Sequence, residues 1–203
     1  LLPKRKVLKM IKLALFTVTY CGLWYKGRAL SLKEQIEKAQ ELGFDGVSIE
    51  TKRPVALPCD LDETARKEIK EFADSQDITI AAIETMSNFT SPVIEDRENN
   101  LCMIREAIEL AADLDTSIVK VFAAWPGTSR HGGLGTYNLA RRLHDYVISS
   151  LVTNDQMWRW AVQGIRDAAK WAREYGITIA LQNHPPVINF GYEDALQMAK
   201  ETN

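Results

Sequence analysis

The stretch YGITIALQNH, residues 175–184, places a turn glycine, an apolar strand and two polar side chains in direct succession. Gly176 is suited to end a helix, and residues 177–182 form the β-branched, apolar run that is typical of a buried strand. Side chains alternate along a strand, so Gln182 and His184 share one face. The stretch therefore predicts a helix followed by a buried strand whose end carries chemically active groups.

The same order of glycine, strand and polar end appears in ELGFDGVSIE, residues 41–50. Apolar residues at helical or strand spacing extend the pattern to five βα units. The expected helices are 31–42, 62–75, 95–114, 156–175 and 192–200, and the expected strands are 12–19, 45–50, 78–84, 117–123 and 177–182. Strands that alternate with helices in this way form a parallel sheet with right-handed crossovers.

Two α/β architectures fit this alternation, a doubly wound open sheet and a (β/α)8 TIM barrel. The first strand is followed by an aromatic segment and not by a glycine-rich dinucleotide loop, and the P-loop motif is absent. Polar residues end successive strands at Glu50, Glu84, Gln182 and His184, which favours a barrel with its site at the C-terminal mouth. A closed barrel takes about 250 residues, so we expect this chain to cover roughly the first five βα units of one.

The expected domain runs from residue 10 to 203 and is incomplete at its C-terminal end. Met10 is a plausible native start, which makes residues 1–9 an extension, natural or added. Residues 125–155 form a long insertion between the fourth strand and its helix, where connections usually take about 2–6 residues. Such an insertion is commonly a lid or substrate-selecting segment. The alternatives are a solvated excursion or an oligomer contact.

The composition is that of an ordinary globular chain. There are 25 basic and 27 acidic residues, for a net charge of −2, and 46% of residues are hydrophobic. This balance argues against disorder and against nucleic-acid binding through a broad basic field. No apolar run approaches the ~18 residues of a membrane helix. The three cysteines contain no CxxC pair, so we expect buried or half-buried free thiols and a cytoplasmic protein.

Lys120 stands inside the apolar fourth strand, where a buried charge needs a partner. Glu84, at the end of the neighbouring third strand, is the expected one. The pair is interpreted either as a structural ion pair or as a group that binds substrate at the barrel mouth.

Further candidate substrate contacts follow the strands. Trp24 and Trp125 come after the first and fourth strands, and their rings can stack on sugar faces or simply pack the loops. Asn88, after the third strand, is suited to hydrogen-bond a polyol or to cap the next helix. His131 lies in the long insertion, as a lid acid or an ordinary surface residue.

Four segments together resemble the sugar phosphate isomerase/epimerase family, the xylose isomerase-like TIM barrels. They are KLALFT at 12–17, ELGFDGVSIE at 41–50, VKVFAAWPG at 119–127 and YGITIALQNH at 175–184. Their order and spacing carry the resemblance, which covers nearly the whole chain from Met10. It implies a divalent metal, Mn, Mg or Zn, held at the barrel mouth by a glutamate on the fifth strand and by Asp, His and Glu on later strands. Because relatives are often dimers or tetramers, the resemblance also implies a homo-oligomer.

The sequence departs from that family pattern at two positions. Gln182 stands where the fifth-strand glutamate is expected, and the later ligands would lie beyond Asn203. Many relatives have glutamate where this chain has Ser48, although Glu50 follows on the same face. An amide coordinates through its oxygen but takes no proton at neutral pH. A shuttle between two metal-bound carboxylates is therefore less well supported than a one-base reaction.

The resemblance implies a metal-dependent carbohydrate enzyme that isomerises or epimerises a sugar or keto-sugar by abstracting a proton next to a carbonyl. The expected catalytic residues are Glu50, Glu84, Lys120 and His184, the expected substrate contacts are Trp24, Asn88, Trp125 and His131, and the expected metal ligand is Gln182. The alternatives are a lyase that cleaves 3-keto-glycosides by β-elimination, as the similar C-glycoside deglycosidases do, and a non-catalytic binding or assembly subunit. A relative that cuts abasic DNA is disfavoured by the charge.

Overall fold

The computed structural model describes residues 11–138, 142, 152–184 and 192–203 of the chain. The expected extension at 1–9 lies outside the described residues, as do residues 139–141 and 143–151 of the long insertion. Within the described part of the chain, no helix has the length and apolar character needed to cross a membrane.

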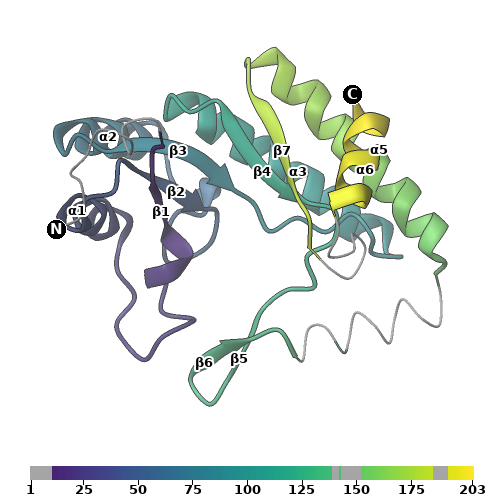
Figure 1. Ribbon diagram of the computed structural model, residues 1–203, viewed down its shortest axis with the longest axis horizontal. Helices are drawn as coiled ribbons and strands as arrows, with labels where there is room; N and C mark the ends of the chain where they lie inside the picture. Colours follow the sequence, from purple (N-terminus) through teal and green to yellow (C-terminus); the bar gives the residue numbers. More distant parts are fainter. Residues whose placement is uncertain (1–10, 139–141, 143–151, 185–191) are drawn as a thin grey trace, which may run out of the picture.

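The described residues form a parallel sheet whose strands are joined by helices (Figure 1). The sheet order is β1-β2-β3-β4-β7, with parallel pairing throughout. The strands are β1 Ala14–Phe16, β2 Gly46–Glu50, β3 Thr79–Glu84, β4 Ile118–Phe122 and β7 Thr178–Gln182, and the helices are α1 Leu32–Leu42, α2 Glu63–Ser75, α3 Ile94–Asp113, α5 Asn154–Glu174 and α6 Tyr192–Thr202. The five predicted βα units are confirmed.

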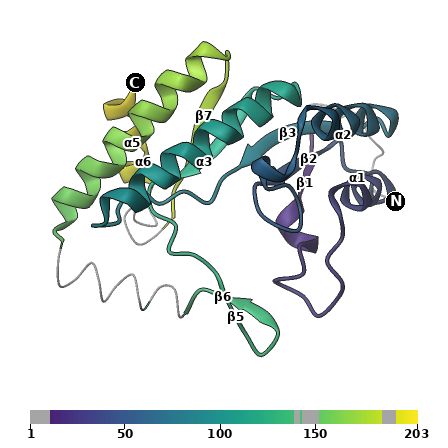
Figure 2. The ribbon, with the colours of Figure 1, turned by 180° about the vertical axis from the view of Figure 1, so that it is seen from behind.

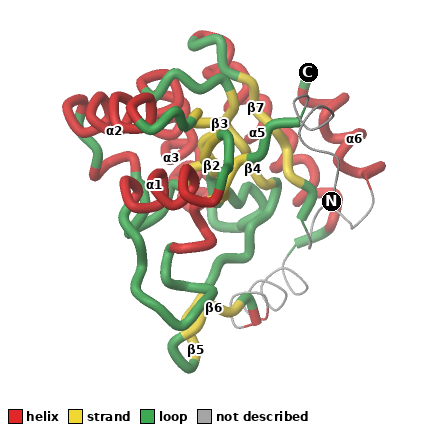
Figure 3. Tube along the Cα trace, turned by 60° about the vertical axis from the view of Figure 1, so that its left-hand side comes forward, coloured by secondary structure: helices red, strands yellow, loops and turns green. Residues whose placement is uncertain are grey.

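The helices form a continuous layer along one side of the sheet. Each helix contacts the next in chain order, from α1 through α2, α3 and α5 to α6, and Figures 2 and 3 show this layer from behind and from the side. The strand residues that face the helices are fully buried, namely Val47, Ile49, Ile83, Val119 and Val121. Because side chains alternate, the other face of the sheet is left for the polar strand ends.

The helix boundaries follow local signals in the sequence. Ser31 begins α1 through a capping box, as its position predicts, and Gly43 ends the helix in the left-handed conformation with φ of 78°. The helix α5 begins at Asn154, two residues earlier than expected, because Thr153 forms a second capping box with Gln156. The capping side chains satisfy backbone N–H groups that have no partner inside the helix.

The first strand is shorter than predicted. It ends at Phe16, and Thr17–Tyr20 turn into the 3-10 helix η2 instead of continuing the strand to residue 19. The buried hydroxyl of Thr17 accepts a hydrogen bond of 2.8 Å from the backbone N–H of Glu50. This bond ties η2 to the C-terminal end of β2 and takes the backbone out of the sheet.

The long insertion contains a β-hairpin that the sequence analysis missed. It consists of β5 Ser129–His131 and β6 Leu134–Thr136, which pair antiparallel. Gly132 and Gly133 form its turn with φ of 60° and 82°. Two-residue hairpin turns of this kind need positive φ at both central positions, which favours glycine. The hairpin stands beyond the C-terminal ends of the strands (Figure 1).

The cysteines are free thiols, as predicted, but their burial is only partly as expected. Cys21 is buried, whereas Cys59 and Cys102 are exposed. Both exposed residues lie on outer elements, in the 3-10 helix η3 Pro58–Asp60 and in α3. A cysteine preference for burial is a tendency, and the position within an element decides the outcome.

Candidate functional site

A cavity of about 530 Å³ opens at the C-terminal ends of the strands. Residues from several strands and connections line it, namely Phe16, Val18, Thr19, Trp24, Tyr25, Glu50, Lys52, Met86, Lys120, Phe122, Trp125, Tyr137, Gln182 and His184. The cavity brings together six of the residues predicted from the sequence, Trp24, Glu50, Lys120, Trp125, Gln182 and His184. This is the end of a parallel sheet at which barrel enzymes place their sites.

Glu50 is the last residue of β2 and presents a buried carboxylate to the cavity. Its side chain is 1% exposed, and Nζ of Lys52 lies 2.9 Å from Oε1. Apart from this ion pair, no group in the described part of the chain is a hydrogen-bond partner of the carboxylate, and Oε2 has no partner there at all. Buried polar atoms normally have hydrogen-bond partners, so this carboxylate has acceptor capacity that a ligand can fill.

Lys120 projects from β4 on the same side of the sheet and forms the predicted ion pair. Its Nζ lies 2.9 Å from Oε2 of Glu84, and the two residues are register partners on adjacent strands. The ammonium also lies 3.9 Å from the centroid of the Phe122 ring. Burial lowers the pKa of Lys120, and the carboxylates of Glu84 and Glu50 oppose that fall. Glu84 itself does not line the cavity and reaches it only through Lys120.

Gln182 and His184 lie at the end of β7 and share the cavity, as the alternation predicts. Gln182 is exposed and His184 is half-buried. The imidazole packs edge-on against the rings of Phe122 and Trp125, at centroid distances of 5.4 and 4.8 Å. The structure describes no group of three or more His, Cys, Asp or Glu side chains able to hold a metal. The described residues therefore supply part of a metal site at most.

Three aromatic rings from loop segments form a second wall of the cavity. We call Trp24, Trp125 and Tyr137 the aromatic wall. The Tyr137 ring lies 4.8 Å from that of Trp24 and 5.3 Å from that of Trp125. Trp125 stacks at 4.9 Å on Phe122, at the end of β4. The aromatic wall thus continues directly from the sheet.

The hairpin holds Tyr137 in this wall by docking on the connection between β1 and α1. The N–H of Gly135 donates to the carbonyl of Leu23 at 2.5 Å, and Nη2 of Arg130 donates to the carbonyl of Gly22 at 3.0 Å. A side chain at Gly135 would meet the Leu23 carbonyl and the Trp24 ring at 3.1 Å. Glycine therefore permits the close approach of the two segments.

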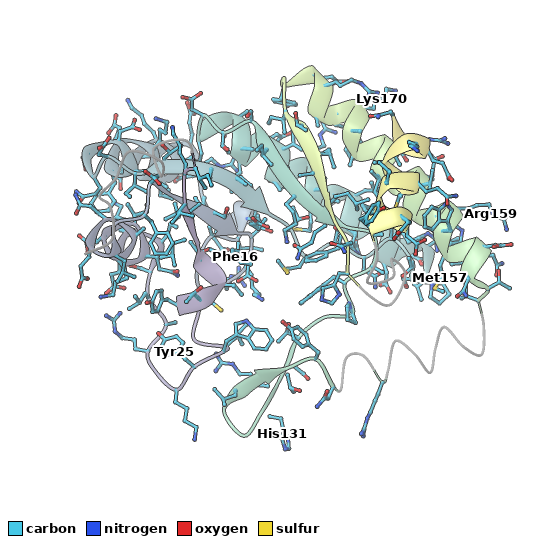
Figure 4. All side chains as sticks on the ribbon, in the orientation of Figure 1. Phe16, Tyr25, His131, Met157, Arg159 and Lys170 are labelled. Carbon is cyan, nitrogen blue, oxygen red and sulfur yellow. The ribbon has the colours of Figure 1, made fainter. Side chains whose placement is uncertain are left out.

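Two predicted substrate contacts are not among the residues that line the cavity. The side-chain oxygen of Asn88 accepts hydrogen bonds from the N–H and hydroxyl of Thr90, so this amide braces its own loop. His131 is exposed near the hairpin tip and points away from the strands (Figure 4). It belongs to a second hollow, with Arg130 and Arg142. The geometry of His131 favours its alternative interpretation as a surface residue. Asn88 does not cap the next helix, α3, whose N-cap is Val93.

Two lining residues that bear on the chemistry, Lys52 and Tyr137, were not predicted from the sequence. Lys52 follows β2 by two residues and acts through its ion pair with Glu50. No local pattern marks it. A signal for Tyr137 was available, because Gly132-Gly133 is a typical hairpin turn and predicts that the following residues fold back. The contact of that hairpin with a segment more than a hundred residues earlier has no local signal.

Comparison with known proteins identifies the fold. No curated protein matches the sequence. Among solved structures, the D-psicose 3-epimerase of Clostridium cellulolyticum H10 has a TM-score of 0.70 and 16% identity, and the 3-keto-D-glucoside 4-epimerase of E. coli has 0.66 and 17%. A zinc-bound IolI protein has 0.67 and 17%. Each alignment covers 95% of this chain and 59–64% of the other, so the chain spans about 60% of their length.

The family is shown by the sequence itself. The model that describes the xylose isomerase-like TIM barrel matches residues 36–203, which is most of the chain. The parallel sheet, its layer of helices and the cavity at the strand ends agree with that match. This chain therefore belongs to the family of xylose isomerase-like TIM barrels.

Proposed function

We propose that the protein is a carbohydrate enzyme of the isomerase or epimerase kind, which acts on a sugar or keto-sugar by removing a proton next to a carbonyl. The observation that carries the proposal is the buried carboxylate of Glu50, which faces the cavity and has no hydrogen-bond partner among the described residues beyond its ion pair with Lys52. Membership of the family and the solved epimerases of the same fold support it.

In this proposal Glu50 is the general base. Its carboxylate takes the proton from the carbon beside the substrate carbonyl, and the electron pair moves onto the carbonyl oxygen to give an enediolate. The ammonium of Lys52 lies 2.9 Å from Oε1 and holds this carboxylate in place on the cavity wall. A base must reach the proton directly, and a position at the end of β2 places the carboxylate on the cavity wall.

Lys120 is the proposed donor to the enediolate oxygen. Its ammonium lines the cavity, where a positive charge in a partly desolvated site stabilises a developing negative charge strongly. Glu84 is a positioning residue, because it touches Lys120 and not the cavity. His184 follows β7, at the edge of the described sheet that is farthest from β1 and β2. It is the proposed group that returns a proton to the other face of the carbon in an epimerisation.

A divalent metal is part of the proposal. Gln182 would contribute its amide oxygen, and His184 is the nearest described imidazole along β7. The remaining donors are not among the described residues. A bound metal would supply Lewis-acid polarisation of the substrate carbonyl. The zinc-bound protein of the same fold supports a metal of this class.

Gln182 favours a second candidate function. An amide cannot serve as a base, so a reaction that needs only one base suits this cavity. β-Elimination from a 3-keto-glycoside is such a reaction, because one group removes the proton beside the ketone and the aglycone leaves with the electron pair. The solved 3-keto-D-glucoside 4-epimerase of this fold supports a keto-glycoside as the substrate.

Proton exchange in D2O tests the proposal. The purified protein is incubated with D-fructose, D-tagatose or methyl 3-keto-glucoside and Mn²⁺, Mg²⁺ or Zn²⁺, and NMR follows deuterium entering beside the carbonyl. We expect exchange with at least one substrate, accompanied by an epimer, an isomer or an eliminated product. We expect Glu50→Gln to lower the exchange rate at least 100-fold, while Glu37→Gln on the exposed side of α1 retains it.

No exchange with any substrate, despite sugar binding, would instead favour the non-catalytic binding or assembly subunit. Equal exchange by the wild-type protein and Glu50→Gln would remove Glu50 as the base.

A further inference from the structure

The two walls of the cavity differ sharply in chemistry. Of the charged lining residues, Glu50 ends β2, Lys52 follows it by two residues and Lys120 lies within β4. The aromatic wall of Trp24, Trp125 and Tyr137 comes from the β1–α1 connection and the β4–α5 insertion. The charged lining groups are therefore all on the sheet side, where Phe16 and Phe122 also line the cavity, and the hairpin side is aromatic without charge.

The rings of the aromatic wall keep surface available. Tyr137 is 41% exposed, and Trp24 and Trp125 are half-buried. Rings that only fill a core are buried on both faces, whereas these contact one another on one side and the cavity on the other. Partly open aromatic clusters of this kind mark binding surfaces.

The aromatic wall is also held in place. The two hydrogen bonds from Gly135 and Arg130 to the β1–α1 connection fix the hairpin beside Trp24, and Tyr137 directly follows the hairpin. A ring fixed before the ligand arrives binds with less loss of conformational entropy. The cavity of about 530 Å³ lies within the range of about 300–1,000 Å³ that holds drug-sized ligands.

We propose that the substrate is a sugar that carries a planar aromatic substituent, as in an aryl glycoside. The sugar ring lies beside Glu50 and Lys120, and the substituent stacks on the aromatic wall. This inference rests on the proposed function, since it assumes that the sugar binds at the strand ends. Of the lining residues on the hairpin side, none carries a charge, which disfavours a phosphate or carboxylate as the substituent.

Calorimetric titration of the purified protein with phenyl β-D-glucoside and methyl β-D-glucoside tests the inference. These probes share the sugar and differ only in the substituent. We expect the phenyl glucoside to bind at least 10-fold more tightly, since stacking on two or more rings contributes beyond simple burial. Tyr137→Leu and Trp24→Leu should each lower this preference at least 3-fold.

Tyr175→Leu is the matched control. Tyr175 is 45% exposed, close to the 41% of Tyr137, but it lies at the end of α5 outside the cavity. It should leave the 10-fold preference unchanged. Equal affinity for the two glucosides, or a preference that survives both cavity variants, would overturn the inference.

The outcomes separate this inference from the proposed function. Equal affinities in a protein that catalyses proton exchange would overturn the aromatic substituent alone. A phenyl preference that depends on Tyr137, in a protein without exchange activity, would support the binding mode and overturn the enzymatic role. Binding of neither glucoside, together with no exchange, would overturn both.

Discussion

The strand ends and the long connections build two adjoining walls of one cavity by different physical means. At the strand ends, Glu50, Glu84 and Lys120 occupy positions fixed by pairing with neighbouring strands. The aromatic wall depends instead on a hairpin that docks on another connection through two backbone carbonyls. A wall made of strand ends is inseparable from the fold, whereas a wall made of connections can change without changing the fold.

The contrast has an energetic side. The ion pair of Glu84 and Lys120 is largely buried, with side chains 15% and 9% exposed. Removing either charge would leave the other buried without a partner, which costs stability. Tyr137 is 41% exposed and closes no core. Changes in the strand-end wall should therefore affect stability and activity together, and changes in the aromatic wall should affect binding alone.

Glu84→Ala should have the largest effect, because it leaves the Lys120 ammonium buried without its partner. We expect the free energy of unfolding to fall by about 3 kcal/mol, the usual cost of breaking a buried pair from one side. Urea denaturation measures it. Glu71→Ala, in the exposed pair with Lys67 on α2, should cost less than about 0.5 kcal/mol.

The double variant Glu84→Ala/Lys120→Met sharpens this test. With both charges gone, most of the lost stability should return, since an apolar side chain suits the contact with the Phe122 ring. A double variant no more stable than Glu84→Ala would mean that the pair matters for packing and not for charge.

Lys120→Met alone should lower stability, because it leaves the largely buried Glu84 carboxylate without its partner, and it should also lower kcat about 100-fold, the usual cost of losing one donor to a developing oxyanion. The measurement is steady-state turnover on whichever substrate shows proton exchange. KM should change little, because the donor acts mainly on the enediolate. Lys67→Met on α2 is the control and should keep full activity. A loss confined to KM would assign Lys120 to substrate binding only.

Thr153→Ala tests the far end of the long connection, where it joins α5. The Thr153 hydroxyl accepts from the N–H of Gln156, and the Gln156 side chain accepts from the N–H of Thr153. Removing this box should cost about 1 kcal/mol of unfolding free energy. Ser75→Ala at the exposed end of α2 should cost less than half as much. Equal losses would mean that the box does not set the start of α5.

The strand-end wall could be predicted from the sequence because its rules are local. A period of two along each strand placed Glu50, Lys120 and Gln182 on one face, and parallel order brought their ends together. The same rule wrongly predicted that Glu84 lines the cavity. Its side chain is on the same face, but it contacts Lys120 and is not among the lining residues. Local alternation gives the face of a side chain and not the identity of the atom that ends nearest the ligand.

The aromatic wall could be predicted only in part. Trp24 and Trp125 directly follow strands, so their place at the mouth follows from the topology. Tyr137 is brought in by a contact between segments more than a hundred residues apart, and such a contact depends on the finished fold. Asn88 shows the converse, because its amide is occupied by Thr90 within its own loop.

Gly135→Ala should have the smallest effect and should separate the two walls most cleanly. A methyl group at this position would meet the Leu23 carbonyl and the Trp24 ring at 3.1 Å, so the hairpin must move by a few tenths of an ångström. The hairpin carries none of the buried core, so the melting temperature should stay within about 1 °C. Affinity for phenyl β-D-glucoside should fall about 3-fold because Tyr137 shifts with the hairpin, while affinity for the methyl glucoside should stay the same.

Gly133→Ala is the comparison variant, because it strains the hairpin turn instead of its docked side. No atom lies within 4 Å of a side chain added there, but φ is 82°. If only Gly133→Ala lowered phenyl affinity, the shape of the turn and not the docked contact would position the aromatic wall.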